Sequence, residues 1–236
     1  MSNSFFQFKQ FRIDQDRSAM KVTTDACILG ASIPVPVYGK ILDVGTGTGL
    51  LSLILAQRTQ CDIEGVEIDE QSYKQATENC QNSPWKERLK ILNEDFKKYN
   101  PPYKFDLVIT NPPFYENQFR SPNPAVNVAR HNDRLPFKEL LDHSKELLKP
   151  GTGLLAILLP GNVAEKFTWM AKAIHLYQQL SIVIKDKPTS FFFREIAVYS
   201  FEVPKKIVEE VITIKGNDNR FTLQFQHLMR PFYLHL

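Results

Sequence analysis

The sequence predicts an α/β protein with an open, mostly parallel sheet and helices on both of its faces. Short apolar segments rich in β-branched residues alternate with longer segments of helical periodicity, which is the pattern of strand–helix–strand units. The first strand leads directly into a glycine-rich loop, and ligands of such sheets bind where the strands end. The first four strands are expected at residues 40–44, 62–68, 89–92 and 105–110, and the first two helices at residues 50–58 and 70–81.

The length and composition fit one domain with a full hydrophobic core. The chain has 236 residues, of which 43% are hydrophobic. We expect a single domain over residues 1–236, in which residues 40–204 form the core sheet. Residues 1–39 are expected to form an N-terminal extension and a helix on the cofactor side, and residues 205–236 a C-terminal strand and helix.

Composition also narrows the functional class. No apolar run is long enough to span a membrane, and the N-terminus lacks the charged-then-apolar layout of a signal peptide. Three scattered cysteines without metal-ligand spacing favour free thiols in a reducing cytoplasm and no metal site. The net charge of +3 permits a nucleic-acid partner without requiring one.

The N-terminal segment is aromatic, with basic residues between the rings. Residues 5–13 predict a strand or hairpin that packs on the domain, either covering a sheet edge or forming a wall beside the substrate. A helix is expected at residues 26–33, capped by Thr24 or Asp25 and ended by the prolines that follow. Capping is the simplest role for this stretch, and a place beside a cofactor carboxylate is the alternative for Lys21 and Thr24.

The loop after the first strand has the form of a cofactor cradle. In the sequence Gly45-Thr-Gly47-Thr-Gly49 the glycines let the backbone approach a ligand, and the helix that follows offers free amides. Asp43 disfavours a pyrophosphate and suits a cationic or amino-bearing ligand, and the glycine spacing differs from that of dinucleotide-binding loops. Glu67 ends the second strand, where a carboxylate can accept both hydroxyls of a ribose. Together these features indicate a nucleoside cofactor.

The third strand is followed by a further acid. Asp95 can accept the exocyclic amine of an adenine, with Phe96 beside the ring, although a solvated acid is common in such a turn. Three strands thus bring Asp43, Glu67 and Asp95 to one edge of the sheet, because the carboxyl ends of parallel strands meet there.

The fourth strand ends in Asn111-Pro112-Pro113-Phe114. The prolines fix an extended, rigid loop. The Asn111 side-chain oxygen and a carbonyl of this loop can accept N–H bonds from a delocalised amine and so direct its lone pair, while Phe114 stacks on the ring that carries the amine. The alternative is a plain turn, because Asn-Pro often ends a strand.

Residues 115–136 form a long polar loop that carries several cations. Loops of this length are usually functional or disordered. A flipped nucleotide and its phosphates fit the side chains of Phe114, Tyr115, Arg120, Arg130, His131 and Arg134. One alternative is a solvated loop without a role. Another is His131 as a general base, which is disfavoured because an amine can lose its proton to water after it has reacted.

The second half of the chain supplies the remaining elements. Apolar stripes predict helices at residues 137–148 and 163–174 and a terminal helix at 221–229, and strands are expected at 153–160, 180–184, 195–201 and, at the edge, 208–214. Phe191, Phe192 and Phe193 can contact RNA bases, although packing against the N-terminal segment is favoured. Further candidate phosphate contacts are Arg220, His227 and Arg230.

A resemblance to a known class rests on four of these motifs. Asp43-Val-Gly-Thr-Gly-Thr-Gly49, Glu67, Asp95-Phe96 and Asn111-Pro-Pro-Phe114 resemble the motifs of class I S-adenosylmethionine-dependent methyltransferases that act on amines. The resemblance implies a Rossmann-like, seven-stranded sheet with the last strand antiparallel. It also implies that Gly45, Gly47 and Gly49 lie near the methionine part of the cofactor, Glu67 at the ribose with Ile68 beside it, Asp95 and Phe96 at the adenine, and Asn111 to Phe114 at the target.

More specific segments point to one branch of that class. Met20-Lys-Val-Thr-Thr-Asp25, Leu29-Gly-Ala31, Asn111-Pro-Pro-Phe-Tyr115 and Ala129-Arg-His131 are similar to the bacterial tRNA(Val) adenine-N6 methyltransferases, which modify the adenosine next to the anticodon. The similarity extends over nearly the whole chain, including Phe232-Tyr-Leu234. Two positions depart from the pattern: Ala26, where glycine is expected, and Pro231 in the terminal segment.

The resemblance implies direct transfer of a methyl group from S-adenosylmethionine to the N6 of an adenosine in tRNA. The expected site is position 37 of tRNA(Val), with the anticodon stem-loop as partner and a monomer as the acting form. The nearest alternatives are guanine-N2 methylation of ribosomal RNA, glutamine-N5 methylation of a protein and, without catalysis, a cofactor-binding RNA chaperone. The two methylations need the same acceptor geometry, so Asn-Pro-Pro-Phe alone does not separate them.

Overall fold

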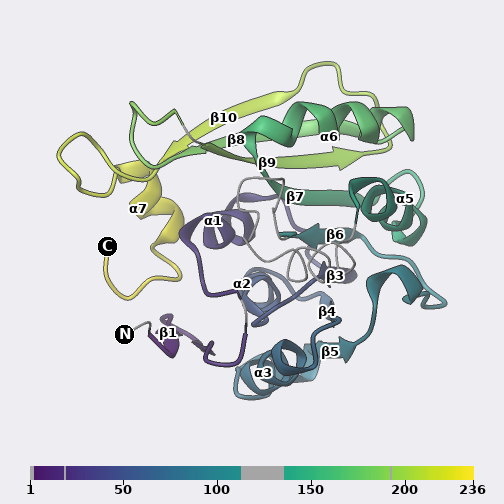
Figure 1. Cartoon of the computed structure of the whole chain (residues 1–236), viewed down its shortest axis with the longest axis horizontal. Helices are drawn as coiled ribbons and strands as arrows, with labels where there is room; N and C mark the ends of the chain where they lie inside the picture. The colour runs from purple at the N-terminus through teal and green to yellow at the C-terminus, as the bar shows by residue number, and fades with distance from the viewer. Residues whose placement is uncertain (1–2, 19, 113–135, 192) are drawn as a thin grey trace, which may run out of the picture.

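A computed structural model of the chain describes residues 3–18, 20–112, 136–191 and 193–236. Its centre is an eight-stranded sheet with the strand order β10-β8-β9-β7-β6-β3-β4-β5 (Figure 1). Every neighbouring pair is parallel except the two that contain β9. The strands are β3 (Lys40–Val44), β4 (Asp62–Glu67), β5 (Leu89–Asn93), β6 (Leu107–Thr110), β7 (Leu154–Pro160), β8 (Tyr177–Lys185), β9 (Phe193–Ser200) and β10 (Val208–Thr213).

The prediction of a Rossmann-like, mostly parallel sheet is confirmed. The resemblance implies seven strands, and the eighth is the edge strand that the sequence predicts at residues 208–214. β9 is the antiparallel strand, and the chain then adds β10 in parallel beside β8. β6 is buried along its whole length because it lies between β3 and β7 and is covered on both faces. The buried β6 brings the Asn-Pro segment to the centre of the sheet edge.

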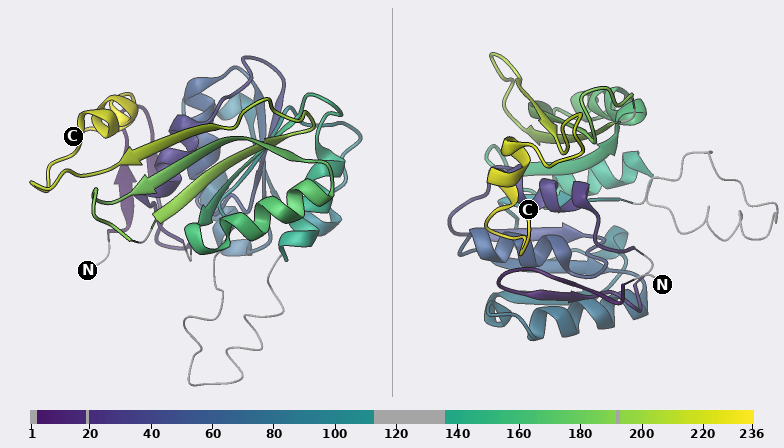
Figure 2. Two further views of the ribbon diagram at one scale, coloured as in Figure 1. Left: turned by 90° about the horizontal axis from the view of Figure 1, so that it is seen from above. Right: turned by 90° about the vertical axis from the view of Figure 1, so that its left-hand side faces the viewer.

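Helices cover both faces of the sheet (Figure 2). They are α1 (Thr24–Ser32), α2 (Leu50–Arg58), α3 (Glu70–Gln81), α5 (Phe137–Leu147), α6 (Gly161–Ala173) and α7 (Leu223–Met229), with short 3₁₀ helices η1 (Lys86–Arg88) and η2 (Phe96–Lys98). One hydrophobic core holds residues of α1, α2 and α7, and the core on the other face holds residues of α5 and α6. None of the helices in the described ranges is long and apolar enough to cross a membrane.

Helix α1 begins earlier than the sequence predicts. Its N-cap is Thr23, whose backbone is extended and whose hydroxyl accepts the Ala26 amide at 3.4 Å. The prediction that Thr24 or Asp25 caps the helix is therefore wrong. Thr24 is the first helical residue, and Asp25 lies in the first turn, where a carboxylate is favourable next to the helix dipole.

The N-terminal aromatic segment forms a hairpin, as one of its predictions stated. β1 (Phe5–Gln7) and β2 (Arg12–Asp14) pair with each other in an antiparallel, two-stranded sheet. The idea that this segment covers an edge of the main sheet is wrong, because the hairpin is attached to α3 instead. The Asp14 backbone exchanges two hydrogen bonds with the Asn79 side chain, at 3.0 and 2.9 Å.

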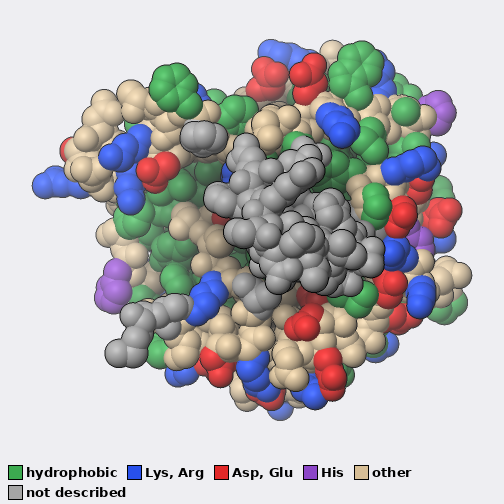
Figure 3. All heavy atoms as spheres, in the orientation of Figure 1, with side chains coloured by type: hydrophobic (Ala, Val, Ile, Leu, Met, Phe, Trp, Pro, Cys, Tyr) green, Lys and Arg blue, Asp and Glu red, His purple; other side chains and the backbone are tan. Residues whose placement is uncertain are grey.

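The C-terminal segment joins the hairpin to α1. The Lys9 amide donates to the Phe232 carbonyl at 2.8 Å. The Tyr233 phenol lies against Cys27 and Thr24 of α1, and its burial raises the pKa of this phenol. Hydrophobic side chains gather accordingly between α7 and the hairpin, at the left of Figure 3. Both ends of the chain are thereby attached to the helix that precedes the first sheet strand.

Helices α1 and α2 cross closely at Gly30. A Cβ at this position would lie 2.8 Å from Ile54 Cγ2, closer than packed carbon atoms approach each other. We expect Gly30→Ala to lower the free energy of unfolding by about 1–3 kcal/mol, the usual range for overpacking, in chemical denaturation. The matched control is Ser32→Ala on the same helix, because the Ser32 hydroxyl is buried without a partner among the described residues. Equal stability of Gly30→Ala and the wild type would contradict the close crossing.

Candidate active site

The glycine loop follows β3 directly and has left-handed backbone. Gly45, Gly47 and Gly49 have φ angles of 68°, 58° and 81°, which favour glycine. A Cβ at Gly45 would meet no atom within 4 Å, and a Cβ at Gly47 would come no closer than 4.0 Å to its neighbours. The loop therefore presents bare backbone to open space, as a cofactor cradle requires.

Asp43 lies under this loop and holds it in place. Its Oδ2 atom accepts hydrogen bonds from the Thr46 hydroxyl at 2.6 Å, the Ser52 hydroxyl at 2.7 Å and the Ser52 amide at 3.1 Å. The Oδ1 atom is buried and has no partner among the described residues. Burial raises the pKa of the Asp43 carboxyl to about 6. An unpaired, buried carboxylate oxygen beneath a cradle suits a ligand with a positive charge.

Glu67 reaches the same loop from the end of β4. Its Oε2 atom accepts the Gly47 amide at 2.9 Å, and its Oε1 atom accepts the Asp69 amide at 3.0 Å. The side chain is half-buried, so its remaining lone pairs can accept hydroxyl donors. The neighbouring Ile68 is 61% exposed. A fixed acceptor beside an exposed apolar side chain suits a nucleoside.

The end of β5 carries Asp95 and Phe96, which have different environments. Asp95 is the N-cap of η2, and its Oδ1 atom accepts the Lys97 amide at 3.0 Å. The Phe96 ring is buried in the core and packs edge-on against His143, with 4.8 Å between the ring centroids. Phe96 thus anchors the strand end in the core, and its contact with an adenine stays a prediction.

Asn111 emerges beside the glycine loop. Thr110 pairs with Val44 across the two strands, and its hydroxyl donates to the Val44 carbonyl at 2.9 Å. The next residues along the two strands are therefore Asn111 and Gly45, at the same height of the sheet edge. Asn111 is half-buried, and no hydrogen bond ties its side chain to another residue of the described ranges. The amide is thus outside the core and next to the cradle.

Other predicted site residues lie outside the described residues. These are Pro113, Phe114, Tyr115, Arg120, Arg130, His131 and Arg134, whereas Pro112 is described and half-buried. Their roles at the target remain predictions.

Lys21 and Thr24 lie just before and at the start of α1, and their roles beside a cofactor stay predictions. Lys21 is exposed and its Nζ atom lies 3.4 Å from the Asn3 carbonyl, while Thr24 lies against the Tyr233 phenol. Ser18, which sequence reasoning did not single out, lies closer to the cradle: its hydroxyl is 4.0 Å from where a Gly47 Cβ would stand. No motif marks this serine, because its place follows from the path of the chain after the hairpin.

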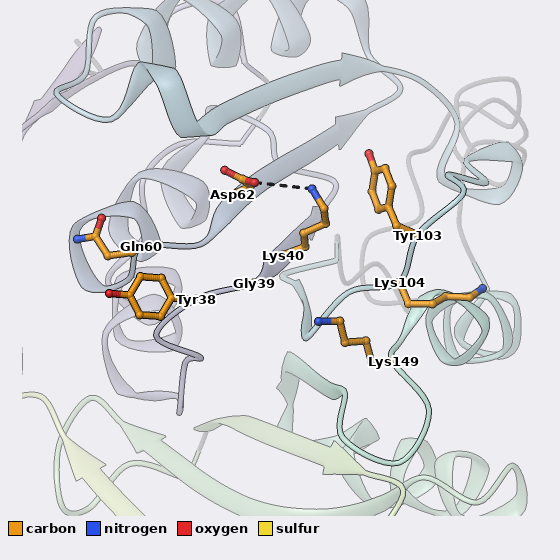
Figure 4. Close-up of a pocket in the computed structure, with 8 residues that line it drawn as sticks. All are labelled: Tyr38, Gly39, Lys40, Gln60, Asp62, Tyr103, Lys104 and Lys149. Atoms are coloured by element: carbon orange, nitrogen blue, oxygen red, sulfur yellow. Dashed lines mark ion pairs between the residues drawn. The ribbon is translucent and has the colours of Figure 1, made fainter.

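A hollow of about 450 Å³ opens at the opposite edge of the sheet, where β3 and β4 begin (Figure 4). Its lysines are engaged with the protein itself. Lys149 pairs with Asp106 at 2.8 Å, and Lys40 lies 3.7 Å from Asp62 and 4.6 Å from the centre of the Tyr103 ring. These contacts hold neighbouring segments of the protein together, so the hollow has a structural role. The candidate active site lies at the opposite, carboxyl edge of the sheet.

The proteins that this chain resembles are consistent with a cofactor site at the glycine loop. The chain matches the family model of the methyltransferase small domain over residues 18–180. A predicted O-methyltransferase from Agrobacterium tumefaciens has a similar structure, with a TM-score of 0.71 at 15% identity, covering 88% of this chain and 96% of that chain. The fold and the glycine-loop site define a class I methyltransferase, whose cofactor is S-adenosylmethionine.

Full-length relatives narrow this class. The tRNA1(Val) (adenine(37)-N6)-methyltransferase of Bacteroides thetaiotaomicron is 40% identical over 238 residues, covering all of both chains. The protein of the same name from Tolumonas auensis is 39% identical, covering 100% of this chain and 99% of the relative. The chain belongs to this tRNA1(Val) (adenine(37)-N6)-methyltransferase family. The resemblance predicted from the N-terminal and Ala-Arg-His segments is confirmed.

The raised pKa of the Asp43 carboxyl predicts how the stability of the protein changes with pH. Because the folded protein binds this proton more tightly than the unfolded chain, the free energy of unfolding falls as the pH rises from about 4 to about 6. In Asp43→Asn the amide oxygen can accept the same three donors, and the buried charge is absent. We expect this variant to be at least as stable as the wild type at pH 7, with the difference shrinking toward pH 4.

Cofactor affinity separates the two roles of Asp43. We expect Asp43→Asn to bind S-adenosylmethionine at least about 10-fold more weakly at pH 7, because a favourable charge interaction of about 1.4 kcal/mol or more is lost. Titration calorimetry measures the affinity, and denaturation between pH 4 and 8 measures the stability. Unchanged affinity would leave Asp43 as a support for the loop alone.

Proposed function

We propose that the chain transfers a methyl group from S-adenosylmethionine to the N6 of an adenosine in tRNA, at position 37 of tRNA(Val). Full-length relatives named tRNA1(Val) (adenine(37)-N6)-methyltransferase support this choice of substrate. The observation that carries the chemistry is the place of Asn111, half-buried at the end of β6 and level with Gly45. The anticodon stem-loop is the proposed partner, a monomer the proposed acting form, and the cytoplasm the proposed location.

The cofactor is proposed to be held by the fixed backbone of the glycine loop and by three acidic side chains. When bound, S-adenosylmethionine supplies a methyl group on a positively charged sulfur. The open space before Gly45 and Gly47 accommodates its methionine part, and Asp43 favours its positive charge from below. Glu67 accepts the ribose hydroxyls, and Asp95 accepts the adenine amine.

The target end is proposed to work through hydrogen-bond acceptors. The adenine amine is a weak nucleophile because its lone pair is delocalised into the ring. Asn111 Oδ1 accepts one of its N–H bonds and a carbonyl of the stiff segment after Asn111 accepts the other, which turns the lone pair toward the glycine loop. No strong base is needed, because the amine loses its proton to water after it has been methylated. Phe114 is proposed to stack on the adenine.

Asn111→Ala tests this assignment directly. We expect the single-turnover rate on saturating tRNA to fall by roughly 10²- to 10³-fold, the usual loss for one positioned acceptor or donor, with cofactor affinity within about twofold of the wild type. Asn111→Asp is the conservative variant, since its carboxylate still accepts an N–H bond, and it should retain more activity than alanine. A wild-type rate for Asn111→Ala would remove Asn111 from the mechanism.

The product identifies the substrate class. Methyl incorporation into total tRNA, total ribosomal RNA and protein extract, followed by mapping of the modified nucleoside or amino acid, separates the alternatives. We expect N6-methyladenosine in tRNA. N2-methylguanosine in ribosomal RNA, N5-methylglutamine in protein, or no product at all would each replace the proposed function.

A further inference from the structure

Two loops lie side by side at the end of the outer strands. The β8–β9 loop and the β10–α7 loop are joined by backbone hydrogen bonds, from the Ile214 amide to the Lys185 carbonyl and from the Lys215 amide to the Asp186 carbonyl, both at 2.8 Å. Figure 1 shows both at the left of the molecule, above the N-terminal hairpin. They form one continuous surface of described residues, 185–191 and 214–220, which we call the outer-loop surface.

The outer-loop surface borders the edge that carries the cofactor cradle. Thr110, the last residue of β6, pairs with Ile157, and β7 continues three residues further to Pro160, which pairs with Arg194 of β9. The sheet therefore extends about 10 Å beyond the end of β6 on this side, at roughly 3.3 Å per residue. Arg194 is also ion-paired with Asp25 in the first turn of α1, at 3.7 Å.

The aromatic side chain of Phe191 on this surface is almost completely exposed to solvent. It is 96% exposed, the highest value among the large hydrophobic side chains that the structure describes. The predicted packing against the N-terminal segment is thus wrong for Phe191. Phe193, two residues on, is fixed against α6, since its ring occupies the space where a Gly161 Cβ would stand. One anchored phenylalanine therefore holds the strand end while the other faces solvent.

The surface is basic as well as aromatic. Its residues and Arg194 include five cations, Lys185, Lys187, Arg194, Lys215 and Arg220, against two acids, Asp186 and Asp218. No described carboxylate is ion-paired with any of the three lysines. Arg220 is exposed, and its Nε atom lies 4.0 Å from Oδ2 of Asp218, which is long for an ion pair. In Figure 3 Lys and Arg side chains gather over the β10–α7 loop, with hydrophobic side chains beside it.

We propose that the outer-loop surface is a contact site for the RNA substrate, separate from the catalytic residues. Phe191 stacks on an unpaired base, and Lys185, Lys187 and Lys215 bind the neighbouring phosphates. An exposed ring among cations is the composition by which proteins hold single-stranded nucleic acid, because a base offers a flat face and the backbone offers charge. The proposal rests on the proposed function, since it takes tRNA as the substrate, and it adds where a further part of that RNA lies.

Phe191→Ser tests the stacking contact. We expect KM for tRNA to rise about 5- to 100-fold, the effect of losing one stacked base, while kcat and the affinity for S-adenosylmethionine stay within about twofold of the wild type. Trp169→Ser is the matched control, because Trp169 is a 67%-exposed aromatic on α6. An unchanged KM for Phe191→Ser, or an equal rise for both variants, would overturn the contact.

The double variant Lys187→Glu/Lys215→Glu tests the phosphates. The slope of log affinity against log salt for tRNA should become shallower by about 1 to 2, because two phosphate contacts are lost. The control is Lys205→Glu/Lys206→Glu, whose exposed lysines follow β9 at the opposite edge of the sheet. Equal slopes for the two double variants would show a general charge effect and contradict the site.

Binding and catalysis distinguish this proposal from the proposed function. Fluorescence anisotropy with a labelled tRNA measures the outer-loop surface without methyl transfer. If the wild type bound tRNA with the expected dependence on these residues but methylated another substrate, the proposed function alone would fail. If it methylated tRNA at N6 and the outer-loop variants bound RNA like the wild type, the outer-loop proposal alone would fail.

Discussion

The site depends on one buried carboxylate. Helix α2 begins after Gly49, which is left-handed and supplies no side-chain cap to the helix. Asp43 replaces the missing cap from the preceding strand, because its Oδ2 atom accepts the Ser52 amide together with the hydroxyls of Ser52 and Thr46. The strand, the loop and the helix are thus joined through a single oxygen atom. The second oxygen has no partner in the described part of the chain, and a buried, unpaired carboxylate oxygen favours a cationic ligand above it.

Neighbouring strands complete the arrangement around this oxygen. The Gly45 amide donates to the Val66 carbonyl at 2.9 Å, and Glu67 accepts the Gly47 amide, so β4 fixes the loop from one side. On the other side, the Thr110 hydroxyl donates to the Val44 carbonyl and sets the height at which Asn111 leaves β6. The cradle and Asn111 are therefore positioned by the sheet itself. Such preorganisation is what a reaction that relies on alignment requires.

The sequence predicted the sheet edge well because the signal there is local. Asp43, Glu67, Asp95 and Asn111 each lie within two residues of the end of a strand, and parallel strands place such ends together. The features it did not predict depend on contacts between distant segments. Ser18 comes near Gly47 only because the hairpin is attached to α3.

Local propensity also failed in two instructive places. Thr23, Thr24 and Asp25 are all good capping residues, so composition alone did not decide which one begins α1. The sequence predicts one role for the three consecutive phenylalanines, but only Phe193 belongs to strand β9. Gly161 leaves room for the Phe193 ring, whereas Phe191 precedes the strand and its side chain is exposed.

Substrate choice has to come from outside the sheet edge. The proposed acceptor pair would direct any delocalised amine, whether it belongs to adenine, guanine or an amide side chain, so this edge alone does not select the substrate. Two of the segments that resemble the tRNA(Val) enzymes, residues 20–25 and 232–234, lie toward the two ends of the chain, and they meet where the Tyr233 phenol lies against Thr24 of α1. The same helix is ion-paired to Arg194 at the base of the outer-loop surface. One helix thus joins the cradle, the termini and a basic, aromatic surface, and a large substrate such as a folded RNA can be recognised over all of them before its amine reaches Asn111.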